Sequence, residues 1–539
     1  MASPDTVASP RIQQPPVRKR PLPSGMLGRL RPRSVVLACI ATAVVHLFSL
    51  SRQLGPDEGG FDMVARFWNH GGGYLYGPSW VDRPPGLIAV FALARLLGPY
   101  GVRLVATAVA VVLVAAVAWG ANVIGGRTSA RWAAWTAFGL ASSVFLQAQR
   151  LNGELLAAAL VALSLGALLH ALRAAATDRQ AAWFGVAAGV AATGAVLVKQ
   201  NFVDGFVFAA VLCGLGLATA HNRLTYRPVR VVAAAGGLLV GASVVAATAM
   251  VWAQAHGGVG AMLFAMFGFR GRALSVIAHW SLAAPSKRLG HLVELGAVSG
   301  VLLLLAHLAF RNRRRLRGPE PLPWALAVTA AVEVAGVLGG ANFWVHYLIA
   351  LIPTVALGAG LAVHARMPGW GVTRVLVAAV VALTVLTSPA AALRAAATPD
   401  TAYTTGTWVG TSAVPADTVV VTYSHANVVA ATGLRPGYPY AWSLPTRTLD
   451  PRLHLLTSDL DARLVGAAPN GRVAAPTWVV QWDAPDTWGL DPHGHVQSAL
   501  QGHYHLVAML CGHAVWLHRG LDRTLAPLPG PTACGPENE

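Results

Sequence analysis

The chain has 539 residues, of which 55% are hydrophobic and 12% are charged, and its mean hydropathy is +0.53. Soluble globular proteins carry about 25% charged residues, so the composition excludes a water-soluble fold, and the high hydrophobicity excludes a disordered chain. A net charge of +18 and a pI near 10.8 are typical of nucleic-acid-binding proteins, but the distribution of that charge, described below, indicates a polytopic membrane protein instead.

Residues 1–33 are rich in proline and contain seven Lys or Arg but only one acid. They contain no cleavage site of small residues, and more apolar segments follow the first one, so we expect a disordered cytoplasmic tail before an uncleaved first span. A span needs about 20 mostly apolar residues. Eleven segments meet this description: 34–51, 102–124, 130–149, 153–173, 181–198, 202–220, 230–253, 291–310, 322–341, 343–364 and 373–392.

The segment 84–98 is apolar but short, and it decides the topology of everything that follows. If it lies along the interface, the basic tail and the loops at 125–131, 174–180, 221–230, 311–320 and 365–374 all face the cytoplasm. With the flanking Arg173, these segments carry 21 basic and 3 acidic residues, and the rest of the chain carries 19 of each. Because cytoplasmic loops are enriched in Lys and Arg, we predict eleven spans in the plasma membrane, with the N-terminus inside and the C-terminus outside.

The composition changes at residue 396, where Pro, Asp, Trp and His become frequent. This predicts a transmembrane domain over 34–395 and a small extracytoplasmic α/β domain over 396–539. Short apolar runs in 416–424 and 476–483 predict strands, as do YHLVAML and HAVWLHR, and 451–466 has the apolar period of a helix. Cys511 and Cys534 lie in the outward part of the chain, where oxidation is permitted, so we expect a disulfide between them.

The first outer loop, 52–101, holds the strongest candidates for chemistry. Asp57 and Glu58 follow the first span closely. Such carboxylates can act as a general base or hold a divalent cation, although solvated charges in a loop turn would give the same pattern. Residues 62–68 predict a short amphipathic helix.

Cations in the outer segments indicate an anionic ligand. Arg83 follows Asp82 in the run DRPPGL, and Lys199 ends a span. The loop 254–290 contains Arg270, Arg272, Lys287 and Arg288 but no acid, which favours phosphate or anionic lipid headgroups as its ligand. Ion pairing for Arg83 and a position at the lipid interface for Lys199 are the alternatives.

Four residues are candidates for facing a substrate cavity: Asp82 in the first outer loop, and Glu154, His346 and Tyr347 near the outer ends of spans. Glu333, in the middle of a span, is expected to be a structural hydrogen-bond partner. The pairs HGH (493–495) and HYH (503–505) have spacings compatible with metal ligands, but no cysteine or carboxylate cluster accompanies them.

In its order of motifs, the chain resembles the GT-C superfamily of membrane glycosyltransferases. It is most similar to the family 39/83 branch, which contains protein O-mannosyltransferases, aminoarabinose transferases and RgtA/B/C/D-like proteins. The resemblance covers residues 34–365 and rests on Asp57-Glu58, DRPPGL (82–87), GPYGVRL (98–104), Glu154, VLVKQ around Lys199, and HYLIALIP (346–353). The chain departs from the family pattern at Arg83, where Lys is commoner, and at Ala350, where Pro or Gln is often found.

The resemblance implies an inverting glycosyltransferase that uses a polyprenyl-phosphate sugar as donor. The active site would open above the membrane, between the first outer loop and the loop 254–290. Asp57, with Glu58 beside it, would activate the acceptor hydroxyl of a glycan, lipid or protein. Arg83, Lys199 and Arg270 or Arg272 would hold the lipid phosphate. The resemblance does not decide whether a divalent cation takes part, and nucleic acid has no role in it.

Two other functional classes fit the sequence. A secondary transporter or lipid flippase would share the spans, although neither an inverted repeat nor a matched pair of broken helices is evident. A non-catalytic scaffold for cell-envelope assembly would keep the fold without needing Asp57. Counterflow in liposomes tests for the transporter, and Asp57→Asn separates the scaffold from the enzyme.

Overall fold

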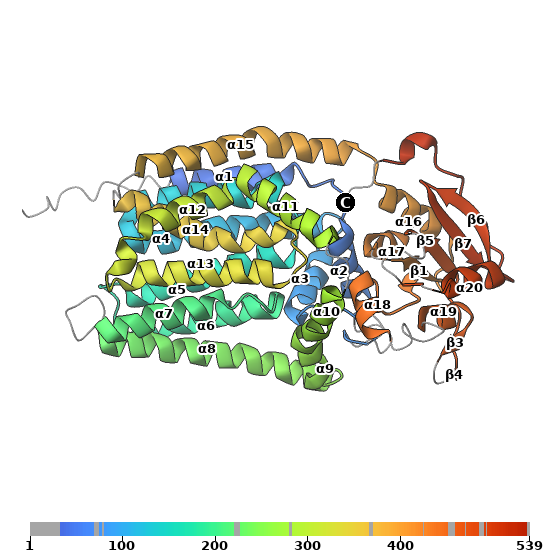
Figure 1. Cartoon of the computed structure of the whole chain (residues 1–539), viewed down its shortest axis with the longest axis horizontal. Helices are drawn as coiled ribbons and strands as arrows, with labels where there is room; N and C mark the ends of the chain where they lie inside the picture. Colours follow the sequence, from blue (N-terminus) through green and yellow to red (C-terminus); the bar gives the residue numbers. More distant parts are fainter. Residues whose placement is uncertain are drawn as a thin grey trace, which may run out of the picture.

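The computed structural model describes residues 33–68, 75–77, 80–219, 227–279, 283–365, 370–423, 425–450, 459–468, 471–483, 490–491 and 493–535. It consists of a long helical bundle with a small sheet domain at one end (Figure 1). The bundle contains α1 (Arg33–Leu47), α4 (Gly101–Ala141), α5 (Gly153–Leu172), α6 (Asp178–Val198), α7 (Asp204–Thr219), α8 (Pro228–Ala255), α11 (Ala283–Val298), α12 (Val301–Asn312), α13 (Pro321–Gly339), α14 (Ile352–His364) and α15 (Trp370–Ala397).

Each of the eleven predicted spans coincides with part of this bundle. Within the described residues, eight helices are long and apolar enough to cross a membrane, and a ninth span is formed if α11 and α12, which meet at 73°, are counted together. Helix α4 holds two predicted spans, because the chain turns at Gly125 and Gly126, and Gly126 has a φ of +61° that suits glycine. Helices α1 and α7 are shorter apolar helices. The protein is therefore a multi-pass membrane protein, as predicted.

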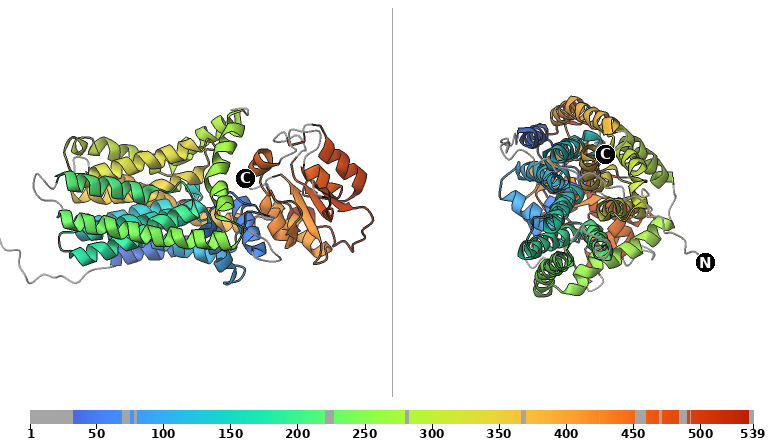
Figure 2. Two further views of the ribbon diagram at one scale, coloured as in Figure 1. Left: turned by 90° about the horizontal axis from the view of Figure 1, so that it is seen from below. Right: turned by 90° about the vertical axis from the view of Figure 1, so that its left-hand side faces the viewer.

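Short helices cross the end of the bundle that faces the sheet domain. They are α2 (Pro56–Phe67), α3 (Pro85–Arg95), α9 (Val259–Leu263) and α10 (Phe269–Ala278), with the π-helical turn η3 (Phe264–Gly268) between the last two. The segment 259–278 passes the length and composition test for a span, but it runs across the bundle end (Figure 2). At 11 residues, α3 is too short to cross a bilayer.

The sheet domain follows α15. Its five-stranded sheet has the order β2 (Arg435–Pro436), β1 (Thr418–Thr422), β5 (Trp478–Gln481), β7 (His513–His518), β6 (Tyr504–Leu510), and β3 (Ala467–Ala468) pairs separately with β4 (Gly471–Arg472). Strand β1 is parallel to β2 and β5, whereas β7 is antiparallel to β5 and β6. The buried Val-rich runs in β1 and β5 are typical of strands covered on both faces.

Helices surround this sheet: α16 (Thr401–Ser412), α17 (Ala426–Thr432), α18 (Ser443–Leu449), α19 (Asp459–Leu464) and α20 (His495–His503). The predicted helix over 451–466 is represented by α19, and residues 451–458 lie outside the described residues. The four predicted strands coincide with β1, β5, β6 and β7. Together, the helical bundle and the small α/β domain have the predicted fold class.

The sheet domain packs closely on α2, the helix that begins with Asp57. A Cβ atom on Gly59 would lie 2.6 Å from the backbone of Asn427, and one on Gly60 would lie 2.3 Å from the ring of Trp442. Only glycine at these two positions permits this approach. Residue Trp80 adds a parallel bridge to Tyr440. The consequence is that α17, α18 and the loop between them cover the outer surface of α2.

The structure joins Cys511 and Cys534 in a disulfide with a Cα–Cα distance of 5.2 Å and a sequence separation of 23. In the chain-entropy model, a closed loop of this length contributes about 3 kcal/mol. We expect Cys511→Ser with Cys534→Ser to lower the unfolding temperature of the sheet domain, measured by limited proteolysis on heating, and to leave the bundle intact. Equal protease resistance with and without a reductant would contradict this expectation.

Candidate functional site

A cavity of about 270 Å³ lies beside α10, a helix at the end of the bundle nearest the sheet domain (Figure 1). Its wall is formed by the C-terminal ends of α6 and α13, the start of α7, one face of α10, and the short helix η5 (Val345–Leu351). Four predicted site residues line it: Glu154, Lys199, Arg270 and Tyr347. The fold therefore brings together side chains from positions 154, 199, 270 and 347, which are far apart in sequence.

Two more predicted residues, Asp82 and Arg83, form a charged cluster with Arg270 beside this cavity. The Asp82 carboxylate pairs with Arg83 at 2.7 Å and with Arg270 at 2.6 Å. Burial opposes ionisation of Asp82, but the two guanidinium groups outweigh it and hold the pKa of this carboxyl below its ordinary value. Burial likewise opposes the charge on Arg83, but Asp82 and Asp57 raise its pKa. The Asp82 carboxylate therefore lies between two guanidinium groups.

Backbone geometry fixes this cluster. Pro84 and Pro85 begin α3, where N–H groups lack helical partners and proline is tolerated. A Cβ on Gly86 would lie 2.6 Å from the Leu197 carbonyl oxygen, so glycine lets α3 contact the end of α6. The motif DRPPGL thus holds Asp82 and Arg83 close to Lys199, which follows α6.

Lys199 is buried and forms an ion pair with Glu154. Its Nζ also lies 4.4 Å from the centre of the Tyr347 ring, a cation–π distance. His346 Nε2 lies 3.6 Å from Glu154 Oε1. Glu154, Lys199, His346 and Tyr347 thus lie together in one group.

Asp57 lies in the first turn of α2 and is half-buried. Its Oδ1 accepts a hydrogen bond of 3.1 Å from the Trp442 indole N–H, and among the described residues no hydrogen bond reaches Oδ2. The charge of Asp57 contributes to the electrostatic environment of Arg83, Lys199 and Tyr347. One carboxylate oxygen thus remains available near the cations of the cavity.

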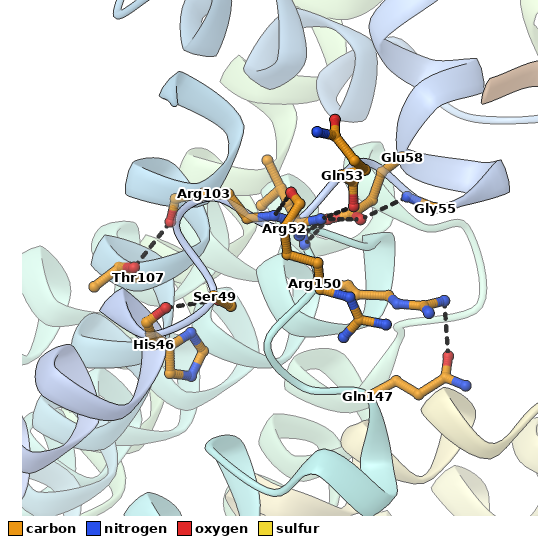
Figure 3. A network of polar contacts seen from close by, with 11 residues as sticks. His46, Ser49, Arg52, Gln53, Gly55, Glu58, Arg103, Thr107, Gln147 and Arg150 are labelled. Atoms are coloured by element: carbon orange, nitrogen blue, oxygen red, sulfur yellow. Dashed lines mark hydrogen bonds and ion pairs between the residues drawn. The ribbon is translucent and has the colours of Figure 1, made fainter. Parts of the chain in front are cut away.

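The position of Glu58 in the structure does not agree with its sequence-based interpretation as a second catalytic acid. It is 2% exposed and forms a two-pronged ion pair with Arg103, with Nη1–Oε1 at 2.5 Å and Nη2–Oε2 at 2.9 Å. The backbone N–H groups of Leu151 and Gly55 also donate to its oxygens. Figure 3 shows this network between the chain after α1, the start of α4 and the Arg150 loop. Because its oxygens are occupied by buried partners, Glu58 anchors α2 rather than facing the cavity.

Arg272 and the histidine pairs lie apart from the site. The exposed Arg272 faces the Phe264 ring at 5.0 Å and does not line the cavity, so of the two predicted arginines it is Arg270 that reaches it. Within the described ranges, no three His, Cys, Asp or Glu side chains gather at metal-binding distance. With Glu58 occupied by Arg103, the Asp57-Glu58 pair does not fit a divalent cation, and no step below uses one.

Several residues of the site escaped the sequence analysis. Helix α2 begins at Pro56, whereas the sequence analysis predicted a helix only from residue 62. Two sequence signals indicate the earlier start: proline at the first helical position, and the capping pair of Gly55 with Glu58. Asp204, an acid inside a predicted span, was a signal for a cavity residue. The contact between Trp442 and Asp57 joins residues 385 positions apart, and no local pattern predicts it.

Comparison with solved structures identifies the architecture. The crystal structure of ArnT from Cupriavidus metallidurans in the apo state matches with a TM-score of 0.62 and 16% identity, covering 89% of this chain and 97% of that one. The same protein bound to undecaprenyl phosphate matches with a TM-score of 0.59 and 16% identity, covering 90% and 98%. The chain has the GT-C fold. No family model matches the sequence, and no curated protein matches it.

The apo oligosaccharyltransferase of Archaeoglobus fulgidus matches this GT-C fold less closely, with a TM-score of 0.50 and 14% identity, covering 88% of this chain and 72% of that one. At such identities the likeness concerns the fold alone. The roles of individual residues therefore rest on the geometry of this chain's own site.

Proposed function

We propose that the protein transfers a sugar from a polyprenyl-phosphate donor to an acceptor hydroxyl of a cell-envelope glycan, lipid or protein. The observation that carries this proposal is the placement of Asp57, which has one oxygen without a hydrogen-bond partner among the described residues, near Arg83 and Lys199. Lys199 and Arg270 line the cavity, and Arg83 shares Asp82 with Arg270 beside it. Arg83, Lys199 and Arg270 come from three separate elements, and each is partly neutralised by an acid. The GT-C fold supports the proposal, and ArnT with undecaprenyl phosphate bound is a protein of this fold.

The proposed reaction is a single displacement. Asp57 Oδ2 accepts the proton of the acceptor hydroxyl, while the acceptor oxygen forms a bond to the anomeric carbon from the side opposite the phosphate. The bond from the anomeric carbon to the phosphate oxygen breaks, and its electron pair leaves with the lipid phosphate. Arg83, Lys199 and Arg270 stabilise the additional negative charge, because fixed cations in a desolvated site strongly favour a developing anion. Displacement from the opposite side inverts the anomeric centre.

Trp442 is proposed to orient the acid. Its indole N–H holds Asp57 Oδ1, so Oδ2 is directed to the acceptor. Because Trp442 belongs to the sheet domain, docking of that domain on Gly59 and Gly60 completes the site. The sheet domain would then contribute directly to catalysis as well as covering the bundle.

The orientation in the membrane follows from charge. The start of α13, the end of α14 and the start of α15 lie at the bundle end away from the sheet domain (Figure 1). The turn in α4 lies there too, because a Cβ on Gly125 would contact His364 at the end of α14. The basic segments 125–131 and 311–320 and the described Arg374 near the start of α15 belong to this end of the bundle. We propose that this end faces the cytoplasm and that the cavity and sheet domain face outward, across the plasma membrane.

A deletion strain provides the direct test of this function. Loss of the protein should cause one polyprenyl-phosphate sugar to accumulate and one sugar to disappear from an envelope glycan, lipid or protein, both measured by mass spectrometry. Complementation with the wild-type chain should reverse both changes. Unchanged lipid-linked sugars and unchanged envelope glycans would contradict the proposal.

Arg270 and Arg272 form a matched pair for testing the phosphate site. Arg270→Gln should raise the KM for the polyprenyl-phosphate donor about tenfold or more, the loss expected for a hydrogen bond to a charged group. Arg272→Gln, at an exposed position only two residues away, should change it by less than about twofold. Both are measured as initial rates with purified protein in liposomes. Equal effects of the two substitutions would contradict this assignment.

A further inference from the structure

The cavity contains two carboxylates that the proposed reaction does not use. Asp204 begins α7 and Glu333 lies on α13, and these two helices pack against each other. Each residue is 3% exposed, and both line the cavity. Glu333 precedes the end of α13 by six residues, or about 9 Å along the helix. Ionisable groups at such positions in membrane helices are costly and usually functional.

Protein contacts do not fully satisfy this pair. Glu333 Oε1 accepts a hydrogen bond of 2.5 Å from the Thr354 hydroxyl, but across the described ranges Oε2 has no hydrogen-bond partner. Neither acid forms an ion pair with another described residue. A buried acceptor without a donor is destabilising, and this side chain borders the cavity, so a ligand there can supply the donor.

The cations of the cavity are not the missing partners. Lys199 pairs with Glu154, and Arg270 pairs with Asp82. A metal ion is also a poor candidate, since in the described part of the chain no third His, Cys, Asp or Glu joins the two acids.

Side-chain amides occupy the same wall of the cavity. Gln200, Asn201 and Asn342 line it, and the buried Oε1 of Gln200 has no partner among the described residues. Carboxylates accept from hydroxyl groups, and amides both donate to and accept from them. A ligand with several neighbouring hydroxyls would therefore satisfy the orphaned oxygens, whereas a polyprenyl chain would satisfy none.

We propose that Asp204 and Glu333 form a subsite that binds the hydroxyl groups of the donor's sugar. The proposal rests on the proposed function, since it requires a lipid phosphate to be held by Lys199 and Arg270 of the same cavity. With about 270 Å³ available, one sugar unit fits between the cations and the acids. Glu333 and Asp204 would then select the sugar, while the cations bind the phosphate that all such donors share.

The experiment compares lipids with and without a sugar. The purified full-length protein in nanodiscs is titrated with undecaprenyl phosphate, and with undecaprenyl-phosphate-linked glucose, mannose and arabinose. We expect the wild type to bind at least one sugar-bearing lipid more tightly than the bare lipid. Glu333→Gln and, separately, Asp204→Asn should weaken that binding about tenfold or more, and should leave the Kd for undecaprenyl phosphate within about twofold. Retained binding of the bare lipid also shows that each variant is folded.

The control is Glu320→Gln, because this acid is mostly exposed and precedes α13 at its opposite end; it should change neither affinity. Unchanged sugar preference in the Glu333 and Asp204 variants would overturn the subsite, as would an equal loss for both kinds of lipid. A wild type that binds the bare and sugar-bearing lipids equally would also overturn the subsite and leave the proposed function standing. A wild type that binds none of these lipids would overturn the proposed function itself.

Discussion

Asp57→Asn should reduce sugar transfer by about 10²–10⁴-fold, the usual effect of losing a general base. Asparagine keeps the shape of the side chain and can still accept the hydrogen bond from Trp442, but it cannot take the acceptor's proton. The measurement is single-turnover transfer from a polyprenyl-phosphate sugar in liposomes. The Kd for undecaprenyl phosphate should change little, because Arg83, Lys199 and Arg270 still bind the phosphate.

Asp62→Asn is the matched control on the same helix. Asp62 pairs with Arg95 at 2.8 Å, away from the cavity, so its loss should affect transfer by less than about twofold. If Asp57→Asn retained near-wild-type transfer, the proposed mechanism would be wrong. The GT-C fold would stand, and a scaffold for envelope assembly would become the better interpretation.

The spans and the strands could be predicted because they depend on local composition. A bilayer imposes long apolar segments, and the buried strands β1 and β5 show as short runs of valine. The approximate membership of the site could be predicted as well. Lys199, Arg270, Tyr347 and Glu154 line one cavity, because polar residues at the ends of membrane helices tend to face the protein interior rather than lipid.

The separate roles of Asp57 and Glu58 could not be predicted. They are neighbours in sequence, but consecutive residues on a helix point about 100° apart, so only the helical conformation of α2 separates them. It directs Glu58 to Arg103 and leaves Asp57 beside Trp442. The loop 254–290 presents a similar problem. Arg270 and Arg272 both lie on α10, but only Arg270 lines the cavity. Which cation reaches the site thus depends on tertiary packing.

Breaking the buried ion pair between Glu58 and Arg103 should be the most destabilising single change at the site. Arg103→Met leaves Glu58 charged, buried and without its partner, and removing one member of a buried pair costs about 3–5 kcal/mol. Arg103 also donates to the backbone oxygens of Arg52 and Gln53, so the chain between α1 and α2 would lose its anchor as well. The expected result is a lower Tm in detergent, measured by fluorescence-detected unfolding.

The double variant Glu58→Gln with Arg103→Met should recover much of that loss, because it removes both charges together and glutamine can still accept from the Leu151 and Gly55 N–H groups. Arg95→Met is the control, since it breaks the more exposed pair with Asp62, and such pairs contribute about 0–1 kcal/mol. A Tm for Arg103→Met equal to that of Arg95→Met would show that the pair does not anchor α2. Recovery in the double variant, accompanied by recovered sugar transfer, would show that Glu58 acts on catalysis only by holding Asp57 in place. Failure of transfer to recover in a stable double variant would instead restore Glu58 to a direct role beside the acceptor.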